Sequence, residues 1–247
     1  MAAGLTGYES LARYYDVLMA DVPYRRWIKF IDSFARRTGK RRARILDAGC
    51  GTGTVAVGLA RRGHRVTAFD QSAEMLALAD AKARRAKVDL LLLQCDFNLW
   101  AGQYDVIIST CDGINHILSV QELVNFFRKA SSGLSRGGFL LFDVNSPYKF
   151  ARVLADNVFY WQVSGLHVVW TNRYQYPYNT AILNIFAQTE PGVFTHAKTE
   201  VIERCYKPAT LVNYLRKSGF KRVCLFDNYK GPLRSARTDR ITVVAQK

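Results

Sequence analysis

The sequence predicts an α/β protein with a doubly wound, mostly parallel sheet of seven strands and a small antiparallel β-sheet inserted near its end. Three observations support this fold class. Short apolar strands alternate with helices over residues 1–150, which is typical of a parallel sheet with right-handed crossovers. Aromatic and β-branched residues then alternate with polar residues, as in antiparallel strands with one buried face. A helix and two strands follow and return to the first pattern.

The first elements are two helices, followed by repeated strand–helix units. Leu11, Tyr15 and Leu18 recur at helical spacing, and Pro23 starts a second helix that ends near Arg37. The apolar character of the strands indicates burial on both faces of the sheet. The expected strands are 44–48, 65–70, 88–93, 104–110 and 138–144. The expected helices are 52–62, 72–86, which Ser72 is expected to cap, and 120–134.

The region from about 158 to 206 breaks this pattern. Leu166, Val168, Trp170, Tyr174 and Tyr176 fall on one face of an extended chain, which predicts a half-buried antiparallel strand. Turn signals near 177–179 and 190–192 divide the region into three or four strands. A helix over 208–218 and strands over 223–227 and 240–245 then complete the main sheet.

We therefore divide the chain into three parts. Residues 1–150 hold the N-terminal helices and most of the α/β core, 151–206 the inserted strands, and 207–247 the end of the core. Aromatic residues of the insertion would wall an apolar substrate pocket, form a homodimer contact, or fill the core of the small sheet. For the insertion as a whole, a lid or a dimer contact is favoured, because function lives in parts grafted onto a fold. The aromatic residues are Trp161, Trp170, Tyr174, Tyr176 and Phe186.

Composition excludes several classes of protein. No apolar run reaches the roughly 18 residues of a membrane span, and the polar start from Met1 to Asp16 predicts no signal peptide. The five cysteines are scattered and form no Cys-x-x-Cys pair, and the four histidines are isolated. We therefore expect a cytoplasmic protein with reduced thiols, no disulfide framework and no metal site.

The formal net charge of +15 has two interpretations. It is either the electrostatic footprint of a nucleic-acid-binding protein or the solvated surface of a protein from a basic proteome. The basic residues form several clusters spread along the chain. Because a nucleic-acid footprint is usually gathered on one face, the sequence favours the second interpretation.

A glycine-rich turn directly follows the first strand. Asp47 precedes Gly49, Gly51 and Gly53, and the turn opens the next helix, whose N-terminus offers N–H groups and partial positive charge. Asp70 ends the second strand 19 residues after Gly51, where a carboxylate can accept the hydroxyls of a ribose. The alternative is a tight turn without a ligand.

The glycine spacing also separates ligand classes. Nicotinamide proteins prefer Gly-x-Gly-x-x-Gly, whereas this turn reads Gly-x-Gly-x-Gly. The carboxylate of Asp47 and the turn backbone suit the ammonium and carboxylate of an amino-acid group better than a pyrophosphate. A nicotinamide oxidoreductase is therefore disfavoured.

Several segments resemble the signatures of class I S-adenosylmethionine-dependent methyltransferases. The resemblance covers nearly the whole chain, is weakest over the inserted strands, and implies a Rossmann-like fold, S-adenosylmethionine as cofactor and S-adenosylhomocysteine as product. The N-terminal region resembles a bacterial small-molecule subgroup with a glycine N-methyltransferase-like start. The matching segments are 14–27, 45–53, 66–75, 96–97, 104–109, 112–116 and 137–143.

By this resemblance, the glycine turn lines the methionine end of the cofactor and Asp70 holds its ribose. Gln71 and Met75 flank the adenine, Asp96 accepts from the adenine amino group, and Phe97 supplies a backbone donor. N-terminal aromatic residues would close over the cofactor, or would instead attach the N-terminal helices to the sheet. The full set of cofactor-contact residues expected is Tyr8, Tyr15, Trp27, Asp47, Gly49, Cys50, Gly51, Gly53, Asp70, Gln71, Met75, Asp96, Phe97 and Cys111.

The segment after the fourth strand holds the candidates for catalysis. Asn115 and His116 lie at the carboxyl edge, where open α/β sheets bind ligands. His116 is the best candidate for a general base because its reference pKa lies near neutral pH. Alternatively, it packs against the next helix or only orients the substrate. Asp112 and Asp143 would bind a substrate amine or satisfy backbone donors.

Three functions follow from these residues. The first is methyl transfer to nitrogen or oxygen of a small molecule. The second is methylation of tRNA or rRNA. The positive charge supports this function, but the sequence offers no added RNA-binding domain. The third is binding of S-adenosylmethionine without catalysis.

Overall fold

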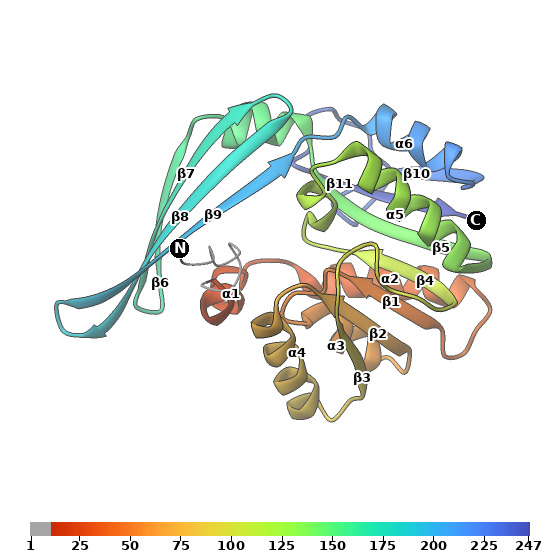
Figure 1. Ribbon diagram of the computed structural model, residues 1–247, viewed down its shortest axis with the longest axis horizontal. Helices are drawn as coiled ribbons and strands as arrows, with labels where there is room; N and C mark the ends of the chain where they lie inside the picture. The colour runs from red at the N-terminus through yellow and green to blue at the C-terminus, as the bar shows by residue number, and fades with distance from the viewer. Residues whose placement is uncertain (1–10) are drawn as a thin grey trace.

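A seven-stranded sheet forms the centre of the molecule, as predicted. We describe residues 11–247 of a computed structural model. The strand order is β10-β11-β5-β4-β1-β2-β3 (Figure 1), and only β11 runs antiparallel to its neighbours, β5 and β10. The strands are β1 Arg44–Ala48, β2 Arg65–Asp70, β3 Leu90–Gln94, β4 Tyr104–Ser109, β5 Leu134–Asn145, β10 Arg222–Asp227 and β11 Arg240–Gln246.

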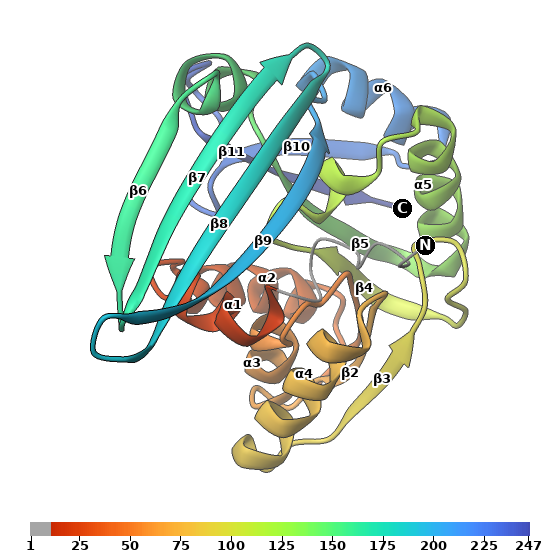
Figure 2. The same cartoon turned by 60° about the vertical axis from the view of Figure 1, so that its left-hand side comes forward.

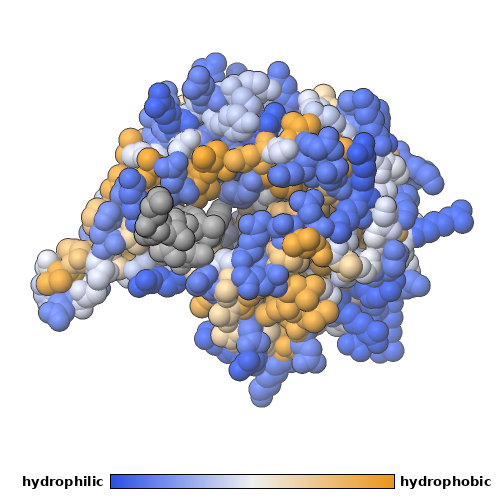
Figure 3. Space-filling model, in the orientation of Figure 1, coloured by the Kyte–Doolittle hydropathy of each residue, from blue (hydrophilic) through white to orange (hydrophobic). Residues whose placement is uncertain are grey.

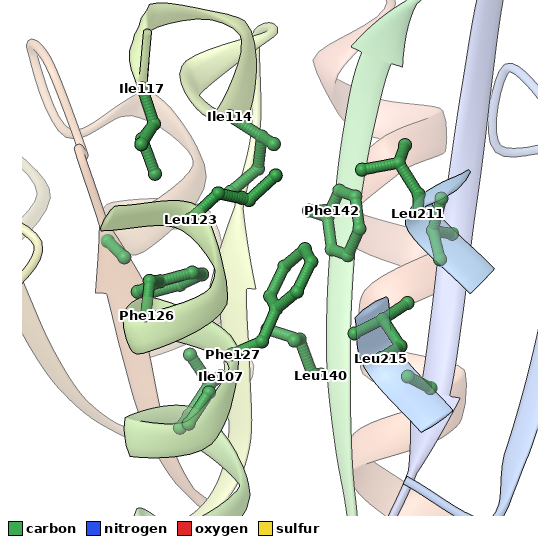
Figure 4. Packing of buried hydrophobic residues seen from close by; sticks show 14 of the residues in the cluster. Ile107, Ile114, Ile117, Leu123, Phe126, Phe127, Leu140, Phe142, Leu211 and Leu215 are labelled. Atoms are coloured by element: carbon green, nitrogen blue, oxygen red, sulfur yellow. The ribbon is translucent and has the colours of Figure 1, made fainter. Parts of the chain in front are cut away.

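Helices cover both faces of this sheet and make two separate cores. One core joins α5 and α6 to one face, and the other joins α2 and α3 to the opposite face. Figure 4 shows Phe127 of α5 packed toward Phe142 of β5, and each such buried ring contributes about 1.5–3 kcal/mol. The helices are α1 Ala12–Leu18, α2 Tyr24–Arg37, α3 Thr54–Ala60, α4 Ala73–Ala86, α5 Val120–Gly133 and α6 Pro208–Lys217.

The inserted region is a second, four-stranded antiparallel sheet in the order β6-β7-β8-β9. Figure 2 shows it arching over α1 beside the main sheet. Leu166, Val168 and Ile185 of its inner face pack with Leu11 and other apolar residues of the α1 region. Helix α1 therefore lies between the small sheet and the α/β core. The strands are β6 Val158–Val163, β7 Leu166–Gln175, β8 Tyr178–Glu190 and β9 Val193–Arg204.

The boundaries of several elements differ from those expected by a few residues. The third strand begins at Leu90 and not at 88, because Lys87 ends α4 in the left-handed conformation. The fifth strand begins earlier, at Leu134, and pairs with β4 across a register shift. A short π-helix, η2 (Lys149–Leu154), spans the start of the expected insertion and was not predicted.

The surface agrees with the composition. Figure 3 shows hydrophilic residues over much of one face, with hydrophobic residues near the tip of the β8–β9 hairpin, where Val193 and Phe194 are exposed. All five cysteines are free. Among the described residues, no helix is both long enough and apolar enough to cross a bilayer.

Candidate functional site

A cavity of about 340 Å³ opens at the carboxyl ends of β1, β2 and β4. It brings together residues that lie far apart in the sequence, from α1 to the segment after β4. Gly53, Asp47, Trp27, Asp112 and Asn115 lie outside its lining, and Tyr8 lies outside the described residues. The expected residues that do line the cavity are Tyr15, Gly49, Cys50, Gly51, Asp70, Gln71, Met75, Asp96, Phe97, Cys111 and His116.

The glycines of the turn have different structural duties. Gly49 has φ +70°, and a Cβ there would lie 3.3 Å from the ring of Phe97. Gly53 has φ +73° and caps α3, and a Cβ there would lie only 2.8 Å from Cβ of Ala79 in α4. The absence of a side chain at Gly49 therefore lets the backbone approach Phe97 in the cavity wall. At Gly53 it lets α3 and α4 pack closely.

Asp70 holds the turn from the end of β2. Its carboxylate accepts hydrogen bonds from the backbone N–H of Gly51 at 2.8 Å and of Ser72 at 3.0 Å. Burial raises the pKa of Asp70, while these backbone donors act to lower it. Ser72 caps α4, as predicted, by accepting from the N–H of Met75. The carboxylate is therefore fixed at the cavity wall by local backbone.

Asp47 is fully buried beside the turn. Neither carboxylate oxygen has a hydrogen bond of normal geometry to a described residue, although the N–H of Ala56 lies near enough to lower the pKa. Burial, and then the nearby Asp70, raise the pKa of Asp47 to about 7. An uncompensated carboxyl at this place fits a ligand that carries positive charge.

The N-terminal helices close one side of the cavity. The hydroxyl of Thr52 and the ammonium of Lys82 donate to the carboxylate of Asp16, at 2.6 and 2.9 Å, and so fasten α1 to the core. This places Tyr15 in the cavity wall, as expected, together with Tyr24 of α2. Tyr24 was not among the candidates, although it lies within the segment that carries the family resemblance.

The expectation that Trp27 covers the cofactor needs correction. Its indole is 2% exposed, stacks on Tyr229 at 4.7 Å and lies under the guanidinium of Arg240. The periodicity of α2 points this side chain into the core between α2 and the sheet. Trp27 therefore attaches the helix to the sheet, which was the alternative interpretation.

The far end of the cavity holds Asp96 and Phe97. Asp96 accepts from the N–H of Asn98 at 2.7 Å, forming a local Asx turn, and still lines the cavity. The ring of Phe97 packs edge-on against Phe69 and Phe126. Met75 is buried in helix packing and also lines the cavity, so both of its proposed duties are compatible.

His116 lies in the cavity wall, in the short helix η1 (Gly113–His116). Burial lowers the pKa of its imidazole, while Asp112 and a hydrogen bond to the backbone of Ile202 act to raise it. Since a ring N–H that donates to a carbonyl fixes the tautomer, β9 orients this histidine. The neutral form is the one that accepts a proton.

Asn115 is not placed for catalysis, which corrects that expectation. It is fully buried, donates from Nδ2 to the carbonyl of Arg204 at 2.8 Å, and accepts from the N–H of Asn145 at 2.9 Å. Both ends of its amide are used to join η1, β5 and β9. Asn115 is therefore a structural residue. Its contribution to the site is to maintain the shape of the sheet edge beside the cavity.

Asp112 and Asp143 lie behind the cavity wall in a buried charge network. Asp143 accepts from the N–H groups of Cys111 and Asp112, so it satisfies backbone donors. Arg240 of β11 bonds both carboxylates. Burial opposes ionisation of Asp112, but Arg240 and then Lys149 hold its pKa well below the usual range. Asp112 therefore acts on His116 through its nearby negative charge, and it is not positioned to contact the substrate directly.

The inserted aromatic residues do not line the cavity. Trp161 and Trp170 pack within the small sheet and against its neighbours, and the ring of Phe186 stacks on His196. Tyr174 stacks on Phe150 of η2, and Tyr176 is exposed. The core of the small sheet thus accounts for most of them, and the homodimer contact stays a prediction.

Comparison with known proteins identifies related chains. A family model described as a methyltransferase domain matches residues 45–138. A methyltransferase of Geobacillus sp. (strain WCH70) is 31% identical over 97% of this chain and 99% of its own length. Glycine/sarcosine N-methyltransferase of Halorhodospira halochloris is 26% identical over 87% of this chain and 80% of its own.

A solved structure agrees with these sequence matches. The crystal structure of an S-adenosylmethionine-dependent methyltransferase from Clostridium acetobutylicum superposes with a TM-score of 0.88 and 27% identity. The match covers 97% of this chain and 98% of that one, so it includes the inserted sheet as well as the α/β core.

Proposed function

Because this chain belongs to the class I S-adenosylmethionine-dependent methyltransferases, we propose that it methylates a nitrogen or oxygen of a small molecule. The observation that carries this proposal is the continuity of one cavity from the glycine turn to His116. The glycine turn, which is expected to bind the cofactor, and His116, the proposed proton acceptor, both line this cavity. The relative from Halorhodospira halochloris, which is named for a small amino acid, supports an acceptor of that size.

The residues of the cavity suit the cofactor in shape and charge. Bound S-adenosylmethionine supplies a methyl group on a sulfonium, which needs no further activation. Asp70 would hold the ribose hydroxyls, and the N–H groups of the turn would bind the carboxylate of the methionine end. The uncompensated carboxyl of Asp47 would offset the positive charge of the ligand. Asp96 and Phe97 would contact the adenine.

The chain's own contribution to the reaction is alignment and proton removal. An in-line displacement needs the acceptor atom opposite the sulfur, and holding the two together supplies much of the rate. The neutral imidazole of His116 would take the proton from the acceptor amine or hydroxyl as that atom attacks. Tyr15 and Tyr24, in the cavity wall, would cover the bound ligand and exclude water.

An acceptor screen tests this proposal. We expect turnover with at least one member of a panel of small amines and phenols, and none with bulk tRNA. His116→Ala should lower turnover about 100-fold without changing S-adenosylhomocysteine affinity, measured by calorimetry. The matched control is His196→Ala, because His196 is exposed on the small sheet and lies away from the cavity.

Two results would contradict the proposal. Methylation of tRNA without any small-molecule turnover would replace it with the RNA alternative. Equal turnover of His116→Ala and His196→Ala would remove His116 from the role of base.

A further inference from the structure

Strand β9 contacts the segment 115–118, which contains His116, through Ile202 and Arg204. The backbone of Ile202 hydrogen-bonds His116, and the guanidinium of Arg204 donates to the carbonyl of Leu118 at 2.7 Å. The carbonyl of Arg204 accepts from Asn115 at 2.8 Å. Between these contacts lies Glu203, whose side chain must face the other way from that of Arg204 on the strand.

Glu203 points into the buried network behind His116. It is 5% exposed, and its Oε1 accepts from Nδ2 of Asn145 at 2.8 Å. The same Nδ2 donates to Oδ2 of Asp112, also at 2.8 Å. The carboxyl groups of Glu203 and Asp112 additionally hydrogen-bond each other, which requires that they share one proton.

The surroundings decide which of the two carboxyls holds that proton. Asp112 is bonded to Arg240, and Lys149 lies near it. Burial, and then the charge of Asp112, raise the pKa of Glu203 to about 8. Glu203 is therefore the donor and Asp112 the acceptor at neutral pH.

We propose that Glu203 is a positioning residue for His116, acting from the inserted sheet through its carboxyl–carboxylate hydrogen bond to Asp112. This inference rests on the proposed role of His116 as the base. The reactive atoms of Asp112, His116 and Glu203 all lie within 4.8 Å of one another. A donor on Asp112 draws away part of the negative charge that the imidazole would otherwise feel, so the imidazole stays neutral and able to accept a proton.

The other charged groups around this pair support that distribution. Asp70 also acts on His116 across the cavity. Asp143 lies behind Arg240. Lys149 donates to Oδ1 of Asn145 at 2.8 Å, and Asp239 precedes β11 nearby. Arg240 and Lys149 thus lie beside Asp112, so the proton is held more readily by Glu203 than by Asp112.

The same three side chains have the spacing of metal ligands. However, a divalent cation here would face Arg240, which already neutralises Asp112 at 2.9 Å, and the ammonium of Lys149. Repulsion by these two cations opposes such a metal. The shared proton is the better account of the cluster, and metal binding becomes an outcome of the test.

The test is an NMR titration of the His116 Cε1–H signal in full-length protein, with and without S-adenosylhomocysteine, from about pH 5 to about pH 9.5. His116→Gln assigns the signal. In the wild type we expect a second inflection near pH 8, where Glu203 ionises. Glu203→Gln, which stays neutral and keeps a donor, should lose that inflection. Glu203→Ala should raise the pKa of His116 by about half a unit, or about threefold in the protonated-to-neutral ratio.

The control is Glu200→Gln, on the same strand but exposed on the opposite face, which should titrate as the wild type does. Retained inflection in Glu203→Gln, or an unshifted His116 pKa in Glu203→Ala that still binds S-adenosylhomocysteine, would overturn the proposal. Saturable shifts of the His116 signal by Mg²⁺, Mn²⁺ or Zn²⁺ that Glu203→Gln abolishes would overturn it in favour of a metal site. These outcomes do not depend on turnover, so failure of the proposed function is seen separately in the acceptor screen.

Discussion

Asp47 shows most plainly how a single residue can favour function over stability. Its carboxyl is fully buried beside the glycine turn, without a hydrogen bond of normal geometry to a described residue. A buried polar group of this kind costs free energy of folding. The cost makes sense where a cationic ligand compensates the charge, and such strained polar groups cluster at functional sites.

We predict that Asp47→Asn stabilises the ligand-free protein, and increasingly so as pH rises. The folded pKa is raised from 3.8 to about 7, so the folded wild type binds more protons than the unfolded chain between these values and loses stability across that window. Asparagine has no proton to lose. The difference should therefore grow from about pH 4, level off above about pH 7, and reach a few kcal/mol at most.

Urea unfolding at several pH values measures this difference, and calorimetry of S-adenosylhomocysteine should show weaker binding by the same variant. A stability difference that stays constant with pH would mean that Asp47 is compensated in the folded protein. Unchanged affinity would remove Asp47 from the cofactor site.

At the scale of elements, the turn between β1 and α3 depends on the packing of α3 against α4. Gly53→Ala should unfold at lower urea than Gly63→Ala, although both glycines have positive φ. Both variants strain the backbone by about 1–2 kcal/mol. Only at Gly53 does the new Cβ meet a neighbour, Ala79 of α4 at 2.8 Å, whereas at Gly63 nothing lies within 4 Å.

Overpacking of that kind costs about 1–3 kcal/mol more. Because the start of α4 lines the cavity through Met75, Gly53→Ala should also weaken S-adenosylhomocysteine binding, whereas Gly63→Ala should not. Equal loss of stability in the two variants, read from urea unfolding, would show that the contact with Ala79 relaxes without cost.

The elements themselves were largely readable from local pattern. Ser72 capped its helix and the strands fell near their expected bounds, because periodicity and capping act over a few residues. The glycine turn and Asp70 were found for the same reason. The topology of the fold determines which distant segment packs over η1. The inward orientation of the Glu203 side chain and the structural role of Asn115 therefore could not be predicted from sequence spacing.

Arg240 shows the same limit more sharply. It lies in a strand that was predicted correctly, yet its partners are Asp112 and Asp143, far away in the sequence. No local signal distinguishes it from the many other basic residues of the chain. Trp27 was misplaced for a related reason, because an aromatic residue on an amphipathic helix fits a cavity wall and a core equally well.

At the scale of the whole molecule, helix α1 joins the small sheet to the cofactor cavity. It packs under β7 and β8, is fastened to the core through Asp16, Thr52 and Lys82, and places Tyr15 in the cavity wall. We predict that S-adenosylhomocysteine slows amide hydrogen exchange in α1 and in the facing parts of β7 and β8, as well as in α3 and α4.

Lys82→Met provides the comparison, because it removes the ammonium that bonds Asp16, Thr52 and Thr54 but keeps most of the side-chain stem. In this variant, protection by the ligand should persist in α3 and α4 and shrink in β7 and β8. Exchange in β7 and β8 that ignores the ligand in the wild type would show that the two sheets move independently.

The position of Arg240 also has a consequence for how the protein folds during its synthesis. Its strand, β11, lies between β10 and β5, and its guanidinium neutralises Asp143, a residue synthesised 97 positions earlier. At 5–20 residues per second, synthesis of this interval takes about 5–20 seconds. During this time the Asp143 carboxylate lacks the Arg240 guanidinium, and β5 has no neighbouring strand on the side that β11 later occupies. Until β11 has been synthesised, the sheet therefore keeps an open edge at β5, and the charge of Asp143 is neutralised only when that strand is in place.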